Sequence, residues 1–198
     1  MIYLEIFSGL QEKGVRYLVV GGLAMNLHGI PRMTADVDLY VDLERANANR
    51  FLAAMKALGF VPGVPVPAES FADPEARDTW RREKNMLVMG FVNPSRPAIG
   101  LDVFVFEPVP FGPAYERRKR VSVEGEALEI PVASREDLIA MKEGTGRLQD
   151  ASDVKIRRWE AVPVEERLRW LEEANEFLYL AQDAETRARW QAVRRGER

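Results

Sequence analysis

The chain contains no cysteine and only one histidine, His28. The absence of cysteine excludes disulfide scaffolds, thiolate zinc sites and cysteine nucleophiles. A single histidine excludes metal sites built from several imidazoles and leaves one candidate for any histidine-based triad. Any metal ion in this protein must therefore be held by carboxylates.

The sequence also lacks a long apolar run and a strong excess of charge. No stretch approaches the roughly 18 apolar residues that a membrane span needs. The segment Met1–Leu10 carries Glu5 and no cationic region typical of a signal peptide. We therefore expect a cytoplasmic protein without a membrane-spanning segment. With 28 basic and 31 acidic side chains the net charge is −3, so nucleic-acid binding would require a local basic patch.

The composition is that of a globular protein, because 46% of the 198 residues are hydrophobic and 30% are charged. Apolar periodicity predicts strands and helices that alternate up to about residue 132, followed by helices alone. The predicted helices are 2–12, 23–29 and 43–59, and the predicted strands are 15–20, 36–41, 86–92, 100–107, 121–123 and 128–132. The last four strands would form two hairpins. This order predicts an α+β fold with a helical C-terminal part.

Two stretches bear on the boundaries of these elements. The segment Val61–Phe71 contains three prolines, which indicates a loop, and with the polar stretch Asp73–Asn85 behind it we interpret it as a mobile rim. Ser134 is predicted to be the N-cap of the first C-terminal helix, with Asp137 in its acidic first turn. We therefore divide the chain into a core, residues 1–133, and a helical region, residues 134–198, packed on it.

The strongest local signal lies in residues 19–41, VVGGLAMNLHGIPRMTADVDLYV. Asp36 and Asp38 are two apart on a predicted strand, so their carboxylates share one face and can reach a common cation. Gly21 and Gly22 precede them between a strand and a helix, where backbone amides can meet phosphate oxygens without a Cβ in the way. Such a site suits phosphoryl or nucleotidyl transfer. Each piece alone also fits a solvated edge strand or a plain turn.

A third carboxylate strengthens the functional interpretation. Asp102 stands in the otherwise apolar run Ile-Gly-Leu-Asp-Val-Phe-Val-Phe, residues 99–106. An aspartate among residues that favour burial needs a partner or a metal ion.

These residues resemble a known family. The segment 21–41 resembles the first motif of the minimal nucleotidyltransferase superfamily, which is polymerase-beta-like, and within it the AbiEii-like nucleotidyltransferase toxins. The matching positions are Gly21, Gly22, Gly29, Arg32, Thr34, Asp36 and Asp38. The segment 134–154 is similar to the family's helical motif through Lys142, Arg147, Asp150 and Asp153. The second glycine departs from the serine of many superfamily members.

The resemblance implies a fold and a metal site. The fold would be a nucleotidyltransferase-like mixed β-sheet flanked by helices. Asp36 and Asp38 would bind Mg²⁺, with Mn²⁺ as the alternative, and Asp102 would complete the metal site and assist deprotonation of the acceptor. These three aspartates are therefore the predicted catalytic and metal-binding residues.

The same resemblance implies a nucleotide site. Gly21 and Gly22 would hold the β and γ phosphates, Thr34 would lie beside them, and Arg32 and Lys142 would neutralise phosphate charge. The expected function is transfer of NMP from an NTP to a hydroxyl of a tRNA, a protein or a small molecule, with a role related to toxin–antitoxin systems. Neither the acceptor nor the oligomeric state is readable from the sequence.

Several alternatives stay open at this point. The fold could be kept by a catalytically silent nucleotide- or partner-binding module. His28 is interpreted as a helix cap or half-buried side chain rather than a proton carrier. The run Arg117–Arg120 fits either a nucleic-acid patch or a solvated edge strand that blocks aggregation. The cations at 81–84 fit either the acceptor side of a cleft or a loop.

Overall fold

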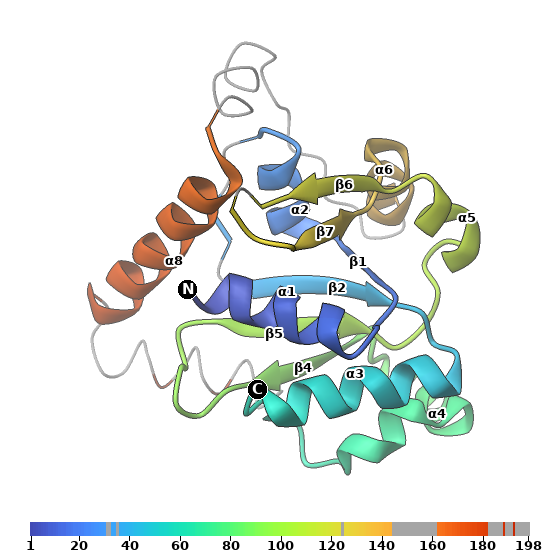
Figure 1. Ribbon diagram of the computed structural model, residues 1–198. Coiled ribbons are helices and arrows are strands. Elements are labelled where there is room, and N and C mark those ends of the chain that lie inside the picture. Colours follow the sequence, from blue (N-terminus) through green and yellow to red (C-terminus); the bar gives the residue numbers. More distant parts are fainter. Residues whose placement is uncertain are drawn as a thin grey trace.

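A computed structural model of the chain describes residues 1–30, 33–34, 36–123, 125–143, 162–181, 188 and 192. Within these residues, seven strands form one sheet flanked by helices (Figure 1). The strands are β1 Tyr17–Val19, β2 Asp36–Val41, β3 Val61–Pro62, β4 Val88–Val92, β5 Gly100–Phe104, β6 Lys119–Ser122 and β7 Glu129–Val132. The helices are α1 Ile2–Glu12, α2 Gly21–Leu27, α3 Arg45–Ala57, the 3₁₀ helix η1 Ala68–Ala72, α4 Pro74–Lys84, α5 Phe111–Glu116, α6 Arg135–Glu143 and α8 Val164–Ala181.

The sheet is mixed, with the strand order β3-β4-β5-β2-β1-β7-β6. Strand β2 pairs in parallel with β5, and β1 pairs in parallel with β7. The other neighbouring strands are antiparallel, among them the hairpins β4–β5 and β6–β7 that the sequence predicted. This arrangement of a mixed sheet with flanking helices confirms the predicted α+β class.

Helices α1 and α3 lie side by side and cover one face of the sheet (Figure 1). The ring of Phe7 on α1 stacks on Tyr17 of β1 with centroids 6.2 Å apart. Phe51 on α3 meets Phe91 of β4 edge-on at 5.5 Å, and Phe91 lies opposite Leu101 of β5. All five side chains are at most 2% exposed, so this face of the sheet is the main core.

Several predicted elements are confirmed. Strand β2 has the predicted bounds, as has the helix α1, and the predicted helix 43–59 is observed as α3, two residues shorter at each end. The Ser134 hydroxyl accepts a hydrogen bond from the Asp137 backbone N–H at 3.1 Å, as expected of an N-cap.

The loop predicted for residues 61–71 is wrong in part. Val61 and Pro62 form the short edge strand β3, which pairs with β4. The 3₁₀ helix η1 then places the fully buried ring of Phe71 5.5 Å from Phe51. Three prolines are compatible with this outcome because an edge strand and a 3₁₀ turn tolerate missing donors.

The polar stretch after this segment is a helix, α4. Asp73 caps it by accepting from the Glu75 N–H at 3.1 Å, Pro74 opens it, and Asn85 ends it with a left-handed φ of 48°. The only large apolar side chain that α4 buries is Trp80, so the sequence shows no apolar stripe. Capping signals rather than periodicity could have predicted this helix.

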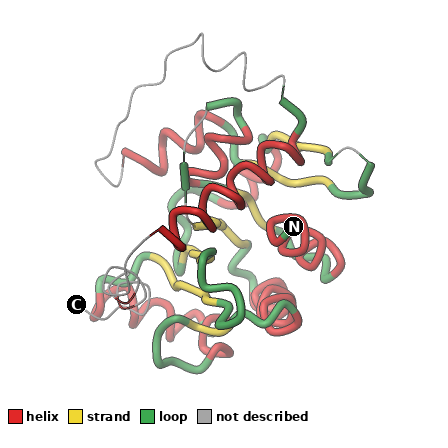
Figure 2. The backbone as a smooth tube through the Cα atoms, turned by 90° about the vertical axis from the view of Figure 1, so that its left-hand side faces the viewer, coloured by secondary structure: helices red, strands yellow, loops and turns green. Residues whose placement is uncertain are grey.

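Helix α8 packs against α1 at the start of the chain. It runs diagonally in front of the strands when the molecule is turned by 90° (Figure 2). The Ile2 backbone N–H on α1 donates to Glu172 Oε2 at 3.0 Å. No helix of the described part has both the length and the apolar composition of a bilayer-spanning segment. The boundary predicted between residues 133 and 134 stays a prediction.

Candidate active site on one face of strands β2 and β5

The three predicted carboxylates share one face of two parallel strands. Asp38 lies directly opposite Asp102 in the β2–β5 register, and Asp36 lies opposite Gly100 two residues earlier. All three aspartates are half-buried, whereas the residues between them are fully buried on the α1 and α3 side. The fold therefore brings together residues that are more than 60 positions apart in the sequence, as the prediction required.

Asp102 has a glycine on its other side. Strand β4 places Gly90 directly opposite Asp102 in the antiparallel register, so this position contributes no side chain beside Asp102. The sequence analysis did not single out Gly90, although a glycine inside a predicted strand signals a bulge or a close approach of a ligand or another backbone. In the register, Asp102 thus has Asp38 on β2 on one side and a glycine on β4 on the other.

The glycine pair is fitted tightly against β2 and the residues before it. Gly21 has φ +61°, and a Cβ added there would lie 2.0 Å from Asp38 Oδ2. A Cβ added at Gly22 would lie 2.8 Å from both Cβ and Oγ1 of Thr34. Both distances are shorter than real Cβ contacts, so larger residues require a rearrangement of the site. Gly21 and Gly22 are the first two residues of α2 and do not precede the helix as predicted, and their missing Cβ atoms bring this first turn (the glycine turn) close to a catalytic candidate.

Thr34 links the turn to the strand. Its hydroxyl donates to the Asp36 carbonyl at 3.2 Å, and its own carbonyl accepts from Asn175 Nδ2 of α8 at 2.7 Å. The predicted phosphate ligand Arg32 lies outside the described residues, as do Arg147, Asp150 and Asp153 of the helical motif. Lys142 belongs to the last turn of α6, but its side chain is not among those described.

His28 has a structural place behind this site. The ring is 5% exposed, and its Nε2 lies 2.8 Å from the Ala133 carbonyl. Because a carbonyl oxygen only accepts, Nε2 carries the proton in this contact. The histidine thereby ties the end of α2 to the end of β7, which agrees with its interpretation as a buried structural residue.

The C-terminal end of α2 is surrounded by cations. Lys119 donates to the Leu27 carbonyl at 3.2 Å, Arg135 donates to the His28 carbonyl at 3.1 Å, and Arg167 donates to the Asn26 carbonyl at 3.0 Å. Carbonyls at the end of a helix lack helical partners and carry the negative end of the dipole. These contacts hold α2, and with it the glycine turn, in place.

The Asn26 side chain on the same helix is a polar group that the sequence analysis missed. It is fully buried, and neither its amide oxygen nor its amide nitrogen has a hydrogen-bond partner among the described residues. An unpaired buried amide costs about 1–3 kcal/mol. Asn26 lies one helical turn after Gly22, so this destabilising side chain is close to the glycine turn.

The basic run Arg117–Arg120 is engaged within the molecule. Arg117 pairs with Asp137 at 2.5 Å, Arg120 pairs with Glu129 at 3.2 Å, and the Arg118 guanidinium lies 4.0 Å from the centroid of the Tyr115 ring. With Lys119 bound to α2, each member of the run has an intramolecular partner. The geometry favours the interpretation as an edge strand over that as a nucleic-acid patch.

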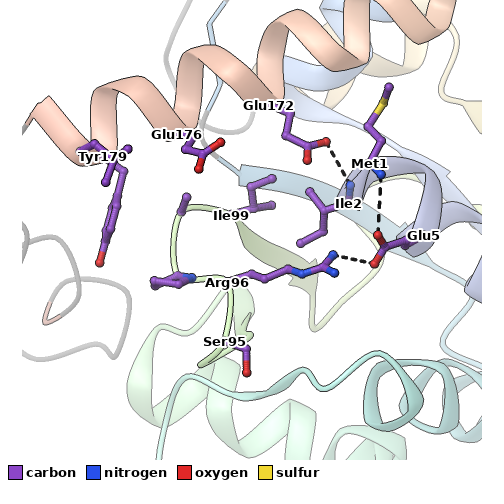
Figure 3. A pocket seen from close by; sticks show the side chains of 12 residues that line it. Met1, Ile2, Glu5, Ser95, Arg96, Ile99, Glu172, Glu176 and Tyr179 are labelled. Carbon is purple, nitrogen blue, oxygen red and sulfur yellow. Dashed lines mark hydrogen bonds and ion pairs between the residues drawn. The ribbon is translucent and has the colours of Figure 1, made fainter.

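Two cavities lie near the ends of the site strands. One, of about 450 Å³, separates α8 from the start of α1 and from residues 95–99 (Figure 3). The other, of about 440 Å³, lies beyond the C-terminal ends of β2 and β5. In the second cavity the Arg81 guanidinium of α4 stands 4.6 Å from the centroid of the Phe106 ring. The cations at 81–84 are thus on a helix, and a role toward an acceptor stays a prediction.

The donor set suits a divalent cation of the magnesium type. Carboxylate oxygens are the ligands that Mg²⁺ prefers, and Asp38 and Asp102 occupy neighbouring register positions. In the described part of the chain, no three carboxylate or imidazole side chains are already gathered around one point. A cation shared by Asp36, Asp38 and Asp102 would therefore require at least one of these side chains to turn. The residues fit the ion by chemistry and by strand register.

The chain matches a family of known proteins. A family model described as nucleotidyl transferase AbiEii toxin, type IV TA system, matches residues 6–142, which is more than half of the chain. The match covers α1 from residue 6 onward, the glycine turn, the three aspartates and all but the last residue of α6. No curated protein matches the chain.

Proposed function

Because the chain belongs to the AbiEii nucleotidyltransferase toxin family, we propose that it transfers a nucleoside monophosphate from an NTP to a hydroxyl group and releases pyrophosphate. The acceptor would be a tRNA, a protein or a small molecule, and the biological setting a toxin–antitoxin system.

One observation carries this proposal. Asp38 stands beside Asp102 on the neighbouring strand, and Asp38 Oδ2 lies 2.0 Å from the position that a Cβ of Gly21 would take. Parts of three separate segments therefore meet on one face of the sheet. A catalytic base, cation ligands and a phosphate-binding turn at one place are what phosphoryl-type transfer requires, because its catalysis consists mostly of positioning and charge neutralisation.

The chain's own residues would divide the work as follows. The turn at Gly21 and Gly22 would hold the β and γ phosphates through backbone N–H groups, and Arg32 and Lys142 would neutralise their charge. The acceptor oxygen would attack the α phosphorus, and the bond from that phosphorus to the pyrophosphate oxygen would break. Asp102 would accept the proton of the acceptor hydroxyl.

Asp36, Asp38 and Asp102 are the residues that would hold Mg²⁺, with Mn²⁺ as the alternative. When bound, such an ion neutralises the charge that builds up on the phosphate oxygens. Without a cation the three carboxylates repel one another and the phosphates, so we expect nucleotide binding to weaken when EDTA is added.

The test is pyrophosphate release from each of the four NTPs with Mg²⁺, measured alone and with total tRNA or cell lysate. Wild type is compared with Asp36→Asn, which removes charge from the site but retains size. Release that disappears in the variant supports a nucleotidyltransferase, and transfer of label from an α-labelled NTP then identifies the acceptor class. NTP binding in calorimetry without any release would instead indicate a catalytically silent nucleotide-binding module.

A further inference from the structure

Helix α8 lies outside the matched part of the chain, yet it contacts the segment that leads into the catalytic strand. The match ends at residue 142, and α8 begins at Val164. From this helix Arg167 donates to the carbonyls of Asn26 and Leu27 at 3.0 and 3.4 Å, at the end of α2. Asn175 donates to the Thr34 carbonyl, just before β2.

These two contacts span the linker between the glycine turn and the aspartates. Arg167 and Asn175 are eight residues apart, which is about 12 Å along a helix and about 80° around its axis. Leu168 and Leu171 between them are fully buried, so this face of α8 is fixed to the core. A rigid helix that holds both ends of the linker sets the distance between α2 and the start of β2.

Asn175 is the more informative of the two contacts. Its side chain is 5% exposed, and its amide nitrogen donates to the Thr34 carbonyl at 2.7 Å and to the Tyr3 hydroxyl at 3.0 Å. Both amide protons are thus used, one toward α1 and one toward the site segment. The Thr34 hydroxyl in turn donates to the Asp36 carbonyl. A short chain of hydrogen bonds therefore runs from α8 to the backbone of Asp36, the first of the proposed catalytic residues.

A second contact of α8 with α1 holds the helix, and with it Asn175, in place. Figure 3 shows Glu172, one turn before Glu176, reaching the Ile2 backbone N–H at the start of α1. Burial raises the pKa of Tyr3 above its usual range, and the negative charges of Glu172 and Asp36 raise it further. The Tyr3 hydroxyl therefore stays neutral at physiological pH and accepts a hydrogen bond from the Asn175 amide.

We propose that Asn175 is a positioning residue for the active site: by holding the Thr34 carbonyl, it fixes the start of β2 so that Asp36 and Asp38 face the nucleotide. This inference rests on the proposed function. It extends the functional unit to the C-terminal helix, because the side chain acts through Thr34 and does not itself touch a substrate.

The experiment compares three variants of the full chain. Asn175→Ala removes both bonds, Asn175→Asp retains size but loses the protons, and Tyr3→Phe removes only the bond to α1. If Asn175 merely stabilises the fold, Asn175→Ala and Tyr3→Phe should have similar consequences for activity. If it positions the site, only changes at Asn175 should impair turnover, because Tyr3→Phe leaves the Thr34 contact intact.

We expect kcat/KM for NTP turnover to fall about 10- to 100-fold in Asn175→Ala, the loss expected from a small misplacement of catalytic groups. It should fall less than about threefold in Tyr3→Phe, even where the two variants lose similar amounts in melting temperature. Asn175→Asp provides a pH signature, because a protonated carboxyl can again donate to the Thr34 carbonyl. Burial raises the pKa of such a carboxyl, so activity relative to wild type should recover as the pH is lowered. The activity of Asn175→Ala relative to wild type should not change with pH.

Hydrogen–deuterium exchange of peptides covering Met33 to Asp38 is a readout that does not depend on turnover. Exchange should be faster in Asn175→Ala and unchanged in Tyr3→Phe. Equal kcat/KM in the two variants of an active enzyme would overturn the positioning role and leave the proposed function standing. If wild type releases no pyrophosphate, the proposed function fails. Faster exchange in Asn175→Ala would then still support the positioning of this segment, and unchanged exchange would overturn it.

Discussion

The two faces of strands β2 and β5 differ sharply, although they are built from alternate residues of the same strands. On one face Val37, Leu39, Leu101 and Val103 are fully buried beneath α1 and α3. On the other face Asp36, Asp38 and Asp102 are half-buried and lie in neighbouring register positions. Each buried aliphatic side chain contributes about 1.5–3 kcal/mol to stability. Three carboxylates on one face bury no comparable apolar surface, and like charges at neighbouring register positions repel one another.

This difference predicts that stability and activity can be separated one residue at a time along a single strand. Residues 37 and 39 pack the sheet against the helices, whereas residues 36 and 38 belong to the candidate site. The predictions below test that separation, starting with the largest effect.

The largest effect is expected from Asp38→Asn. The change removes a charge from the site face without changing its packing, so turnover should fall about 10²- to 10³-fold or more. The melting temperature should stay the same or rise, because like-charge repulsion is relieved. Pyrophosphate release and thermal unfolding, measured on the same sample, provide both values. A large loss of stability would mean that Asp38 is a structural residue.

For Leu39→Ala, one residue further along the strand, we expect a large loss of stability and no loss of turnover. Removing a fully buried side chain from the core face should lower the free energy of unfolding by about 2–5 kcal/mol. The molecules that remain folded should retain wild-type turnover. Urea denaturation followed by activity measurements at low temperature tests this, and lost activity in fully folded protein would contradict the separation of the faces.

Gly21→Ala should lower both turnover and stability. The backbone is left-handed at this position, which costs a non-glycine residue about 1–2 kcal/mol, and the new methyl group would collide with the Asp38 carboxylate. We expect at least a 10²-fold loss of turnover, because Asp38 must move. Gly125→Ala, also left-handed but with open space around its Cβ, is the matched control and should lose stability only.

A smaller change, an increase in stability, is expected from a substitution on the core face. The Tyr17 hydroxyl is buried without a hydrogen-bond partner among the described residues, and burial raises its pKa above the usual range. Tyr17→Phe removes this unpaired group and retains the stacked ring, so stability should rise by about 1 kcal/mol with turnover unchanged. A drop in the midpoint of urea unfolding would show that the hydroxyl has a partner after all.

Much of the fold could be predicted from the sequence, because local patterns carried it. The alternation in Asp36–Val41 predicted β2 with its observed bounds, and it also predicted that two aspartates share a face. Helix α4 was missed because its apolar content is too low for periodicity to reveal. The short helix α5 was also missed, since six residues that include Gly112 and Pro113 show no helical period.

The site could be predicted only in its local parts. The pairing of Asp38 with Asp102 depends on the register of two parallel strands joined by a long crossover, and no local signal fixes such a register. Gly90 and Asn175 become relevant only through that register and through the docking of α8. The roles of Arg32 and Lys142 stay predictions.

The hydrogen bond between the Ile2 backbone and Glu172 has a consequence for biosynthesis. It joins positions 170 residues apart, and the site itself joins segments from the first fifth, the middle and the last fifth of the chain. Such long-range closure is slow compared with local folding. While α8 is still inside the ribosome, the Thr34 carbonyl lacks its hydrogen bond from Asn175. The contacts of α8 with the candidate site therefore form only after α8 has been synthesised and released.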